Sequence, residues 1–318
     1  MILASTSSTR ARILEGFGVE FCQVDSGFDE EGLFEELLDR ARKRARDFID
    51  RDKDFVLQGR VCLDFCPSKN LSSKTLEHIK NLIGENIDGY LALNPKQIAW
   101  ECAKGKLESA LKKIAQNDFA LSEDLRQKNM QEVLKEGILA CDSVVVVHLP
   151  HATHFGQSPT AKSATTSTHN LTSTQNLHFR LGVDFGAYHT RGQNTNDTRD
   201  KDTKKRDCTN LLLRKAKTPT QARIMLELQS GNPISIITAV VYQSHKGFFC
   251  NIDCAEFLLD EFCQDDIECY VKSSLWQGSV GCVKVEGFHK GYILSQKGLE
   301  SCALGLGFER ILPFLGII

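Results

Sequence analysis

The stretch ILACDSVVVV, residues 138–147, places an aspartate and a serine in the middle of eight apolar residues. Consecutive apolar positions predict a strand that is buried on both faces of a sheet. An ionised carboxylate in such a strand needs partners, because desolvation without them is costly. Asp142 therefore either faces a polar site or is a structural aspartate that is satisfied by backbone N–H groups or by an arginine.

Hydrophobic periodicity predicts further elements in the first third of the chain. A short apolar strand is expected at residues 2–4, followed by a hydroxyl-rich turn and a short helix that ends near Gly18. Residues 19–24 alternate between apolar and polar side chains, as in a half-buried strand. Residues 100–116 have their apolar positions at helical spacing, which predicts a helix.

Strands and helices alternate again after residue 210. Thr218 and Pro219 have the residue types of a helix N-cap and first helical position. Apolar runs predict paired strands at residues 233–242 and 247–259, and a capped helix is expected at 265–276. We further expect a strand and turn at 278–288 and a closing helix at 304–315. This alternation predicts an α/β fold with a mixed sheet.

Two segments interrupt the pattern. Residues from about 34 to 97 are mixed and highly charged, and we interpret them as an insertion with helical pieces. Residues from about 149 to 210 are low in complexity, and such polar tracts bury too little surface to offset their ordering entropy. We expect a disordered loop there. Neither half of the chain looks self-sufficient, so the prediction is a single domain, residues 1–318, with two insertions.

Composition narrows the class of protein. The 318 residues carry a net charge of −2, with 25% charged and 41% hydrophobic residues, which gives no reason to expect nucleic acid or a membrane as a partner. Twelve cysteines occur without the spacing of a zinc site, and the N-terminus lacks the pattern of a signal peptide. These features predict a cytoplasmic protein with reduced thiols. The histidines at positions 148, 151 and 154 are interpreted as solvated loop residues rather than metal ligands.

Besides Asp142, three places along the chain hold candidate chemical groups. Ser5, Ser7 and Arg10 follow the opening strand, where hydroxyls, backbone N–H groups and a helix N-terminus make an anion site. The same residue types also simply cap helices. The acidic run 29–31, which contains Glu30, follows a strand and suits either a metal or a solvated turn. Lys106 and Lys215 are the third candidate, although each alone would be an ordinary exposed lysine.

The order of these motifs resembles the Maf proteins, a family of house-cleaning nucleoside triphosphate pyrophosphatases. The stretches that carry the resemblance are ILASTSSTRARIL, FDEE, AKGK, ACDSVVVV, KAK and VGCVKVEGF. They cover roughly residues 1–33, 98–148 and 211–318. The resemblance implies an α/β fold of the Maf/ITPase type, in which helices flank a mixed, twisted central sheet with a cleft for a nucleotide.

The resemblance implies hydrolysis between the α and β phosphates of a non-standard or modified nucleoside triphosphate, with Mg²⁺ or Mn²⁺ as cofactor. The family's proton acceptor corresponds to Asp142, and its metal-binding carboxylates correspond to Glu30 and Asp142. Its phosphate-binding groups correspond to Ser7, Arg10, Lys106 and Lys215. These residue types suit phosphoryl chemistry, which needs cations on the phosphates and a group that aligns water. A homodimer is compatible with the resemblance.

The chain departs from the family pattern at several positions. Thr9 replaces an arginine of the usual Ser-Pro-Arg-Arg, Arg214-Lys215-Ala216 replaces Gly-Lys-Pro, and residues 278–281 lack the Asp-Lys-Ala-Gly signature. The family associates base selection with the positions of Thr9, Ser143 and Glu286. The glutamate, expected to be buried beside the base, is typical of the branch that acts on 7-methyl-GTP rather than dTTP and UTP. The alternative for Glu286 is a solvated glutamate in a turn. The alternative to an enzyme is a degenerate relative that binds nucleotides or a cell-division partner.

Overall fold

The computed structural model describes residues 1–51, 68, 71–84, 87–116, 128–150 and 208–315. Contacts between residues divide the chain into two compact units. The first unit consists of Met1–Thr153 together with Asp207–Ile318, and it contains all the described residues. The second unit, His154–Arg206, lies outside them.

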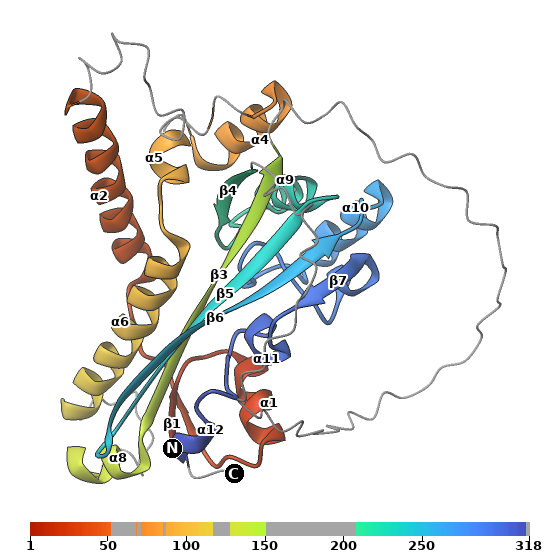
Figure 1. The fold of residues 1–318 in the computed structure, drawn as a ribbon. Coiled ribbons are helices and arrows are strands. Elements are labelled where there is room, and N and C mark those ends of the chain that lie inside the picture. The colour runs from red at the N-terminus through yellow and green to blue at the C-terminus, as the bar shows by residue number, and fades with distance from the viewer. Residues whose placement is uncertain (52–67, 69–70, 85–86, 117–127, 151–207, 316–318) are drawn as a thin grey trace, which may run out of the picture. The chain divides into compact units, whose positions relative to one another are not determined.

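One mixed seven-stranded sheet forms the centre of the first unit (Figure 1). The strand order is β2-β1-β3-β5-β6-β7, and β4 also pairs with β3. β1 runs parallel to β2 and β3, whereas all other pairs are antiparallel. The strands are β1 (Ile2–Ala4), β2 (Cys22–Val24), β3 (Ile138–Pro150), β4 (Cys208–Leu213), β5 (Pro233–Ser244), β6 (Gly247–Leu259) and β7 (Ile293–Lys297). The predicted α/β class with a mixed sheet is confirmed.

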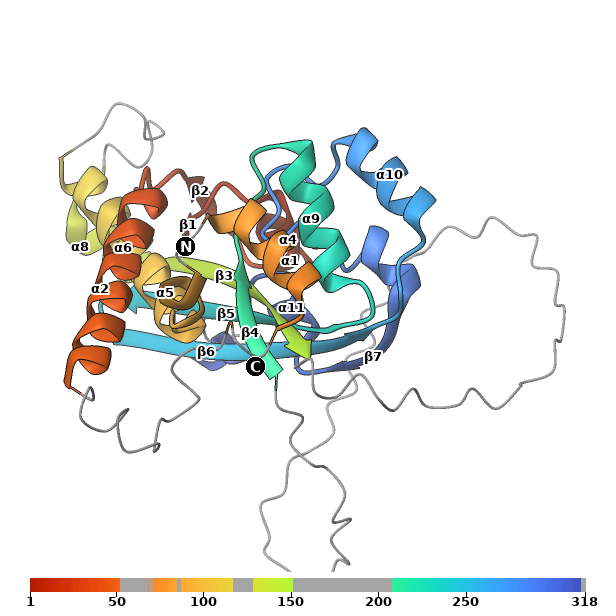
Figure 2. The same cartoon turned by 90° about the horizontal axis from the view of Figure 1, so that it is seen from above.

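Helices flank this sheet. The longer ones are α1 (Ser8–Gly16), α2 (Glu30–Arg51), α4 (Ser73–Ile83), α6 (Pro95–Ala115), α9 (Pro219–Gln229) and α10 (Gln264–Ser273). The shorter ones are α5 (Ile87–Leu91), α8 (Met130–Glu136), the 3₁₀ helix η4 (Phe288–Tyr292), α11 (Glu300–Ala303) and α12 (Leu312–Leu315). α6 packs on β3 and β5, while α2 packs on α5 and α6 (Figures 1 and 2).

α6 brings a lysine into the interior. Asn94 caps the helix with its side chain, and Pro95 follows at the first turn, where proline needs no N–H partner. The buried positions of the helix recur three and four residues apart, which makes one apolar face against the sheet. They are Ile98, Ala99, Cys102, Ala103, Lys106, Leu107, Ala110 and Ile114. Lys106 is therefore a charged residue within an otherwise apolar helix face.

Alternation along β3 separates the two sides of the sheet. Ile138 and Ala140 belong to the core that includes the buried face of α6, whereas Leu139 and Cys141 belong to a smaller core with Leu14 of α1. Because successive side chains of a strand point to opposite faces, Asp142 points toward α6 and Ser143 points to the α1 side. The two polar residues of the strand therefore face different neighbours.

An opening along one edge of β3 lies beside these two residues. β1 pairs with β3 only at Ile138 and Leu139, and β4 pairs only from Val145 onward. On the opposite edge, β5 pairs without interruption along residues 138–147 of β3. Within the described sheet, β1 and β4 thus leave residues 140–144 uncovered on one edge. This gap explains how a polar pair can occupy the middle of an apolar strand.

The structure differs from the sequence predictions in two regions near the C-terminus. The strand and turn predicted at 278–288 are not formed: residues 278–287 form turns and irregular backbone, and Phe288 begins η4, because Gly281 and Cys282 have positive φ angles of 60° and 61°, which a strand does not allow. The closing helix predicted at 304–315 is reduced to Leu312–Leu315, and Gly305 with φ of 90° lies where that helix would begin.

The two segments interpreted as insertions also have altered limits. α2 begins at Glu30, so position 34 falls inside a continuous helix. Leu149 and Pro150 belong to β3, and residues 208–210 belong to β4. The remainder of the predicted disordered loop, residues 151–207, lies outside the described residues. His151 and His154 lie there as well, while His148 is part of β3 rather than a loop.

Candidate active site

A cleft of about 460 Å³ lies at the opening beside β3. Its walls come from the β1–α1 turn, the start of α2, α6, β3, the segment 277–286 and residues 303–305. The cleft brings together every residue that the sequence nominated for the site, although these residues are spread over most of the chain. They are Ser7, Thr9, Arg10, Glu30, Lys106, Asp142, Ser143, Lys215 and Glu286.

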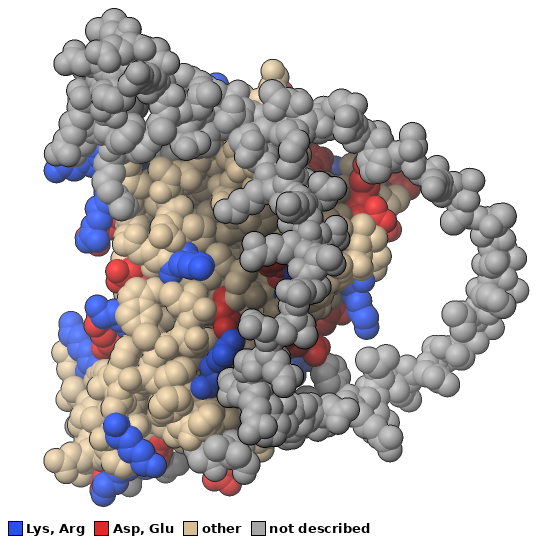
Figure 3. Space-filling view, viewed as in Figure 1, with Lys and Arg blue, Asp and Glu red and all other residues tan. Residues whose placement is uncertain are grey.

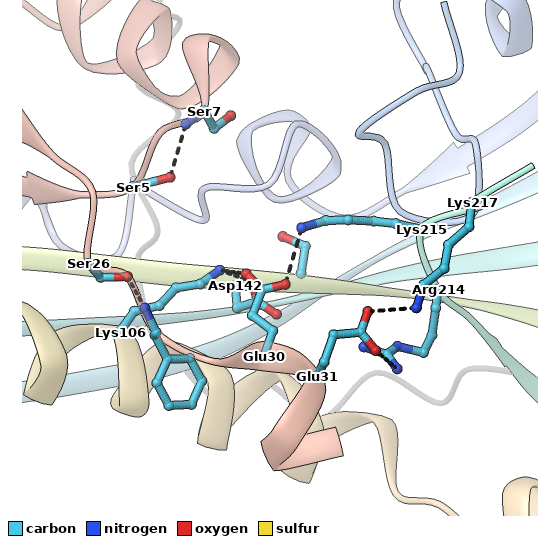
Figure 4. A network of polar contacts seen from close by, with 12 residues as sticks. Ser5, Ser7, Ser26, Glu30, Glu31, Lys106, Asp142, Arg214, Lys215 and Lys217 are labelled. Atoms are coloured by element: carbon cyan, nitrogen blue, oxygen red, sulfur yellow. Dashed lines mark hydrogen bonds and ion pairs between the residues drawn. The ribbon is translucent and has the colours of Figure 1, made fainter. Parts of the chain in front are cut away.

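An ion-pair network occupies the α6 side of the cleft (Figure 4). Lys106 Nζ lies 2.5 Å from Asp142 Oδ1 and 2.7 Å from Glu30 Oε1. Lys215, which follows β4, approaches the same glutamate from the other side, with Nζ 3.1 Å from Glu30 Oε2. The side chains of Lys106 and Asp142 are only 10% and 13% exposed, whereas that of Lys215 is 50% exposed. Two carboxylates and two ammonium groups therefore alternate from the interior to the surface.

Burial and charge act in opposite directions on this network. Burial alone would raise the pKa of the Glu30 carboxyl, but the ammonium groups of Lys106 and Lys215 outweigh it and lower that pKa to about 2. Burial alone would lower the pKa of Lys106, and the carboxylate of Asp142 reverses this, so the pKa lies above its usual value. Both groups are therefore charged at neutral pH.

Arg10 occupies the opposite side of β3. Its guanidinium donates to the carbonyl of Gly305 (2.8 Å), to Ser5 Oγ (3.1 Å) and to Ser143 Oγ (3.4 Å). Ser143 Oγ also lies 2.9 Å from the hydroxyl of Thr238 on β5. The positive charge of Arg10 is close enough to oppose the ionisation of Lys106. The cleft thus presents cations on both sides of the strand, which suits a ligand with several negative charges.

The turn before α1 adds backbone donors to this positive region. Ser7 is the N-cap of α1, and its hydroxyl accepts a hydrogen bond from the backbone N–H of Arg10. The helix N-terminus faces the cleft, where its partial positive charge and free N–H groups favour an anion. The capping role and the anion-site role that the sequence offered for Ser7 are compatible in this geometry.

The positions associated with base selection also line the cleft, but one differs from its prediction. Thr9 is half-buried on the first turn of α1, and Ser143 is tied to Arg10. Glu286 is exposed at the wall, so its predicted burial is wrong and the structure has the alternative, a solvated glutamate in a turn. The exposure follows from the turn conformation of residues 278–287, which replaces the predicted strand.

Several cleft residues were missed at the level of sequence. Lys284 and Gln277 line the wall beside Glu286, and the carbonyl of Gly305 holds Arg10. Arg214 lies over the ring of Phe34 at 3.8 Å from its centroid and pairs with Glu31. A second cavity of about 340 Å³, lined by Arg214 and its neighbours, adjoins the first and shares Glu30, Asp142 and Lys215 with it.

Glu30 and Asp142 are the two carboxylates in the cleft that could hold a magnesium or manganese ion. Both carboxylates reach the same ammonium group, and Mg²⁺ in proteins is usually held by one or two carboxylates together with phosphate oxygens and waters. Among the described residues, no group of three or more His, Cys, Asp or Glu side chains is placed to hold a metal. Cys62 and Cys66 lie outside those residues.

Both charge signs occur on the described surface. Figure 3 shows basic and acidic side chains intermixed on the visible face, in line with the net charge of −2. No helix in the described part of the chain is long and apolar enough to cross a membrane.

Comparison with known proteins supports the resemblance seen in the motifs. Residues 202–316 match the family model described as Maf-like protein. A nucleoside triphosphate pyrophosphatase of Nitratiruptor sp. is 40% identical over 100 residues, which cover 31% of this chain and 54% of that protein. The enzyme of the same name from Helicobacter pylori strain J99 is 39% identical over 106 residues, covering 33% and 56%.

A third protein of that name, from Campylobacter jejuni, is 32% identical over 104 residues, which cover 33% of this chain and 57% of the relative. The chain thus spans about half the length of the curated relatives it matches. The region matched by the family model contains Lys215 and Glu286, and the remaining nominated residues precede it in sequence and join it in the cleft. Residues 202–316 of this chain are thus similar to the Maf-like protein family.

Proposed function

We propose that this protein is a nucleoside triphosphate pyrophosphatase that hydrolyses the α–β phosphoanhydride to a nucleoside monophosphate and pyrophosphate. One observation carries the proposal: Arg10, Lys106 and Lys215 converge on a single cleft that also holds the carboxylates of Glu30 and Asp142. The names of the relatives support the same activity for the matched region.

The arrangement suits this reaction because phosphoryl transfer depends on positioning and on charge stabilisation. The two lysines and Arg10 would bind the phosphate oxygens, aided by the backbone N–H groups at the start of α1. Asp142 would accept the proton of the attacking water, since its carboxylate is held in the cleft by Lys106 and by a strand that pairs with β5 along residues 138–147. The α6 helix and β3 exclude solvent from one side of that carboxylate.

A bound divalent cation would neutralise charge that develops on the phosphates. Glu30 and Asp142 would hold it, with Lys106 moving from the carboxylates to the phosphates when substrate enters. In the proposed physiological role the substrates are non-standard or modified nucleotides, whose removal cleans the nucleotide pool.

The test is pyrophosphate release from ordinary and modified triphosphates with Mg²⁺ or Mn²⁺, comparing the wild type with Asp142→Asn. The amide is nearly isosteric, so the variant should stay folded and lose about 10²–10⁴-fold in kcat. Asp253→Asn, which changes an aspartate on β6 outside the cleft, is the matched control. A normal kcat in Asp142→Asn would show that Asp142 is not the general base. A wild type that binds nucleotides without turnover supports the alternative of a degenerate binding protein.

Base preference is a second part of the proposal. A glutamate at position 286 can accept hydrogen bonds from N1–H and the exocyclic amine of guanine, but it cannot donate to the carbonyl oxygens of thymine or uracil. Because Glu286 is exposed on a turn, it would have to close over the base. We expect higher kcat/KM for GTP or 7-methyl-GTP than for dTTP and UTP, and Glu286→Gln should narrow that ratio. A wild type that prefers dTTP or UTP contradicts the proposed preference for guanine and leaves the proposed pyrophosphatase activity in place.

A further inference from the structure

A buried polar network lies directly behind the cleft wall formed by residues 277–286. Gln229, the last residue of α9, and His289, in η4, are both 0% exposed. Gln229 Nε2 donates to the carbonyl of Gly281 at 2.8 Å. The backbone N–H of Lys284 donates to Nδ1 of His289 at 3.1 Å. Two side chains that lie outside the cleft therefore hold the backbone of its wall at two points.

The hydrogen-bond pattern fixes the protonation state of the histidine. Since the N–H of Lys284 is a donor, Nδ1 of His289 carries no proton, and Nε2 must donate to Gln229 Oε1, which lies 3.0 Å away. The amide group of Gln229 then points its two donors at the carbonyls of Met225 and Gly281. Every polar atom of both side chains has a defined partner, so the network is rigid.

The surroundings keep this histidine neutral. Its ring packs edge-on against Phe262 and Phe288, with centroids 5.6 and 5.1 Å apart. Burial among these side chains lowers the pKa of His289 to about 4, although the bond from Lys284 acts in the other direction. The neutral ring required by the hydrogen bonds is therefore the form present at neutral pH.

The wall depends on such anchors because regular secondary structure does not hold it. Residues 278–287 lie outside the described strands, and their backbone pairing with the sheet region is the isolated bridge between Lys215 and Val280, beside which the N–H of Gly281 donates to the carbonyl of Arg214 at 2.9 Å. Tyr270 adds a third anchor by donating its hydroxyl proton to the carbonyl of Cys282 at 3.0 Å. Losing a buried partner leaves an unsatisfied backbone group, which the wall can relieve only by moving.

We propose that Gln229 and His289 are positioning residues for nucleotide recognition, which set the location of residues 277–286 without touching the nucleotide. This inference rests on the proposed function of the cleft. The groups assigned to the reaction lie on β3, α6, α2, α1 and just after β4, and their described hydrogen bonds and ion pairs do not include Gln229 or His289. Loss of the network should therefore weaken nucleotide binding and change the reaction step much less.

The experiment compares His289→Leu, which removes both hydrogen bonds, with His289→Asn, whose amide oxygen can still accept from the N–H of Lys284. His148→Leu is the matched control, because the ring nitrogens of His148 also hydrogen bond, to Asn210 and Ser235, at a site outside the cleft. Binding is measured by calorimetry with GTP and UTP analogues that carry a methylene group between the α and β phosphorus atoms. Hydrogen exchange of residues 278–287 reports on the wall itself.

For His289→Leu we expect a Kd and KM raised about tenfold, kcat changed less than about threefold, and faster exchange at residues 278–287. His289→Asn should lie between this variant and the wild type, and His148→Leu should match the wild type in Kd. If His289→Leu does not fold, the same measurements are made on His289→Asn and Gln229→Glu. The second variant places a carboxylate oxygen against the Gly281 carbonyl in place of the amide donor.

The outcomes separate the two proposals. One outcome is that the wild type binds the analogues but releases no pyrophosphate from triphosphates, and that His289→Leu binds them more weakly. This outcome supports the positioning role and overturns the proposed pyrophosphatase activity. Unchanged Kd, KM and exchange in a folded His289→Leu overturns the positioning role and leaves the enzyme. A wild type that binds neither analogue overturns both.

Discussion

Lys106 is expected to stabilise the folded protein because its ammonium group pairs with two carboxylates and offsets the repulsion between them. The variant Lys106→Met tests this. The ammonium group lies 2.5 Å from Asp142 and 2.7 Å from Glu30, and its side chain is 10% exposed. Methionine retains most of the stem and removes the charge. Breaking a buried ion pair by deleting one partner typically costs about 3–5 kcal/mol, because it leaves an uncompensated buried charge. We expect a decrease of this size in the free energy of unfolding at neutral pH.

The decrease should depend on pH. With Lys106 present, the pKa of Glu30 is about 2, so in the wild type this carboxylate contributes stability above the usual pKa of 4.5 and loses it only as the pH falls toward 2. Without Lys106, burial acts to raise the pKa of Glu30, opposed by Lys215 alone. In the variant, Glu30 then takes up a proton at mildly acidic pH, and this removes its repulsion with the carboxylate of Asp142. The difference between wild type and variant should therefore shrink by about 1 kcal/mol or more between neutral pH and pH 4.5.

The assay is urea unfolding followed by circular dichroism at several pH values. Lys104→Met is the matched control, because Lys104 lies on the same helix, is 45% exposed and pairs with Glu108 at 3.6 Å. An exposed pair of this kind is worth about 0–1 kcal/mol. A loss below about 1 kcal/mol in Lys106→Met that does not vary with pH would refute the reasoning, since the buried charge would then need no counter-ion.

Two further predictions concern stability away from the reacting groups. His289 has a pKa of about 4 in the folded protein against a usual value of 6.5, so the unfolded chain binds the extra proton first and stability is lost as the pH falls from 6.5 toward 4. Between pH 7 and pH 5 the wild type should lose about 2 kcal/mol that His289→Asn does not lose, and equal losses in urea unfolding would contradict this. Thr218→Ala removes the side-chain cap of α9, in which the Thr218 hydroxyl accepts from the N–H of Gln221. The variant should lower the free energy of unfolding by about 1 kcal/mol, and an unchanged value would show that the cap does not stabilise the protein.

The sequence determined the elements whose signals are local. Periodicity predicted β3, β5 and β6, because apolar runs bounded by polar or glycine residues have few other stable solutions. Thr218 followed by Pro219 predicted the start of α9, because capping depends only on neighbouring residues. The motif order also pointed to a phosphate-binding site with Asp142, Glu30 and the two lysines, and the cleft holds all of them.

Local signals failed where long-range contacts decide the backbone. The turn at residues 278–287 contains Val280, Val283 and Val285, which favour a strand, but the anchors from Gln229 and His289 hold it in turns. Glu286 is exposed for the same reason. Gln229 is 52 positions from Gly281 and 60 from His289, so no pattern within the segment itself reveals the network that holds it.

The tertiary structure alone decided what Asp142 faces. The sequence could place a carboxylate in a buried strand, but it could not show that β1 and β4 end on either side of residues 140–144. That opening arises from strand pairing, and the partner of Asp142 comes from α6, thirty-six residues earlier in the chain. A strand sets which face a side chain takes, whereas the neighbours on that face depend on how distant elements pack.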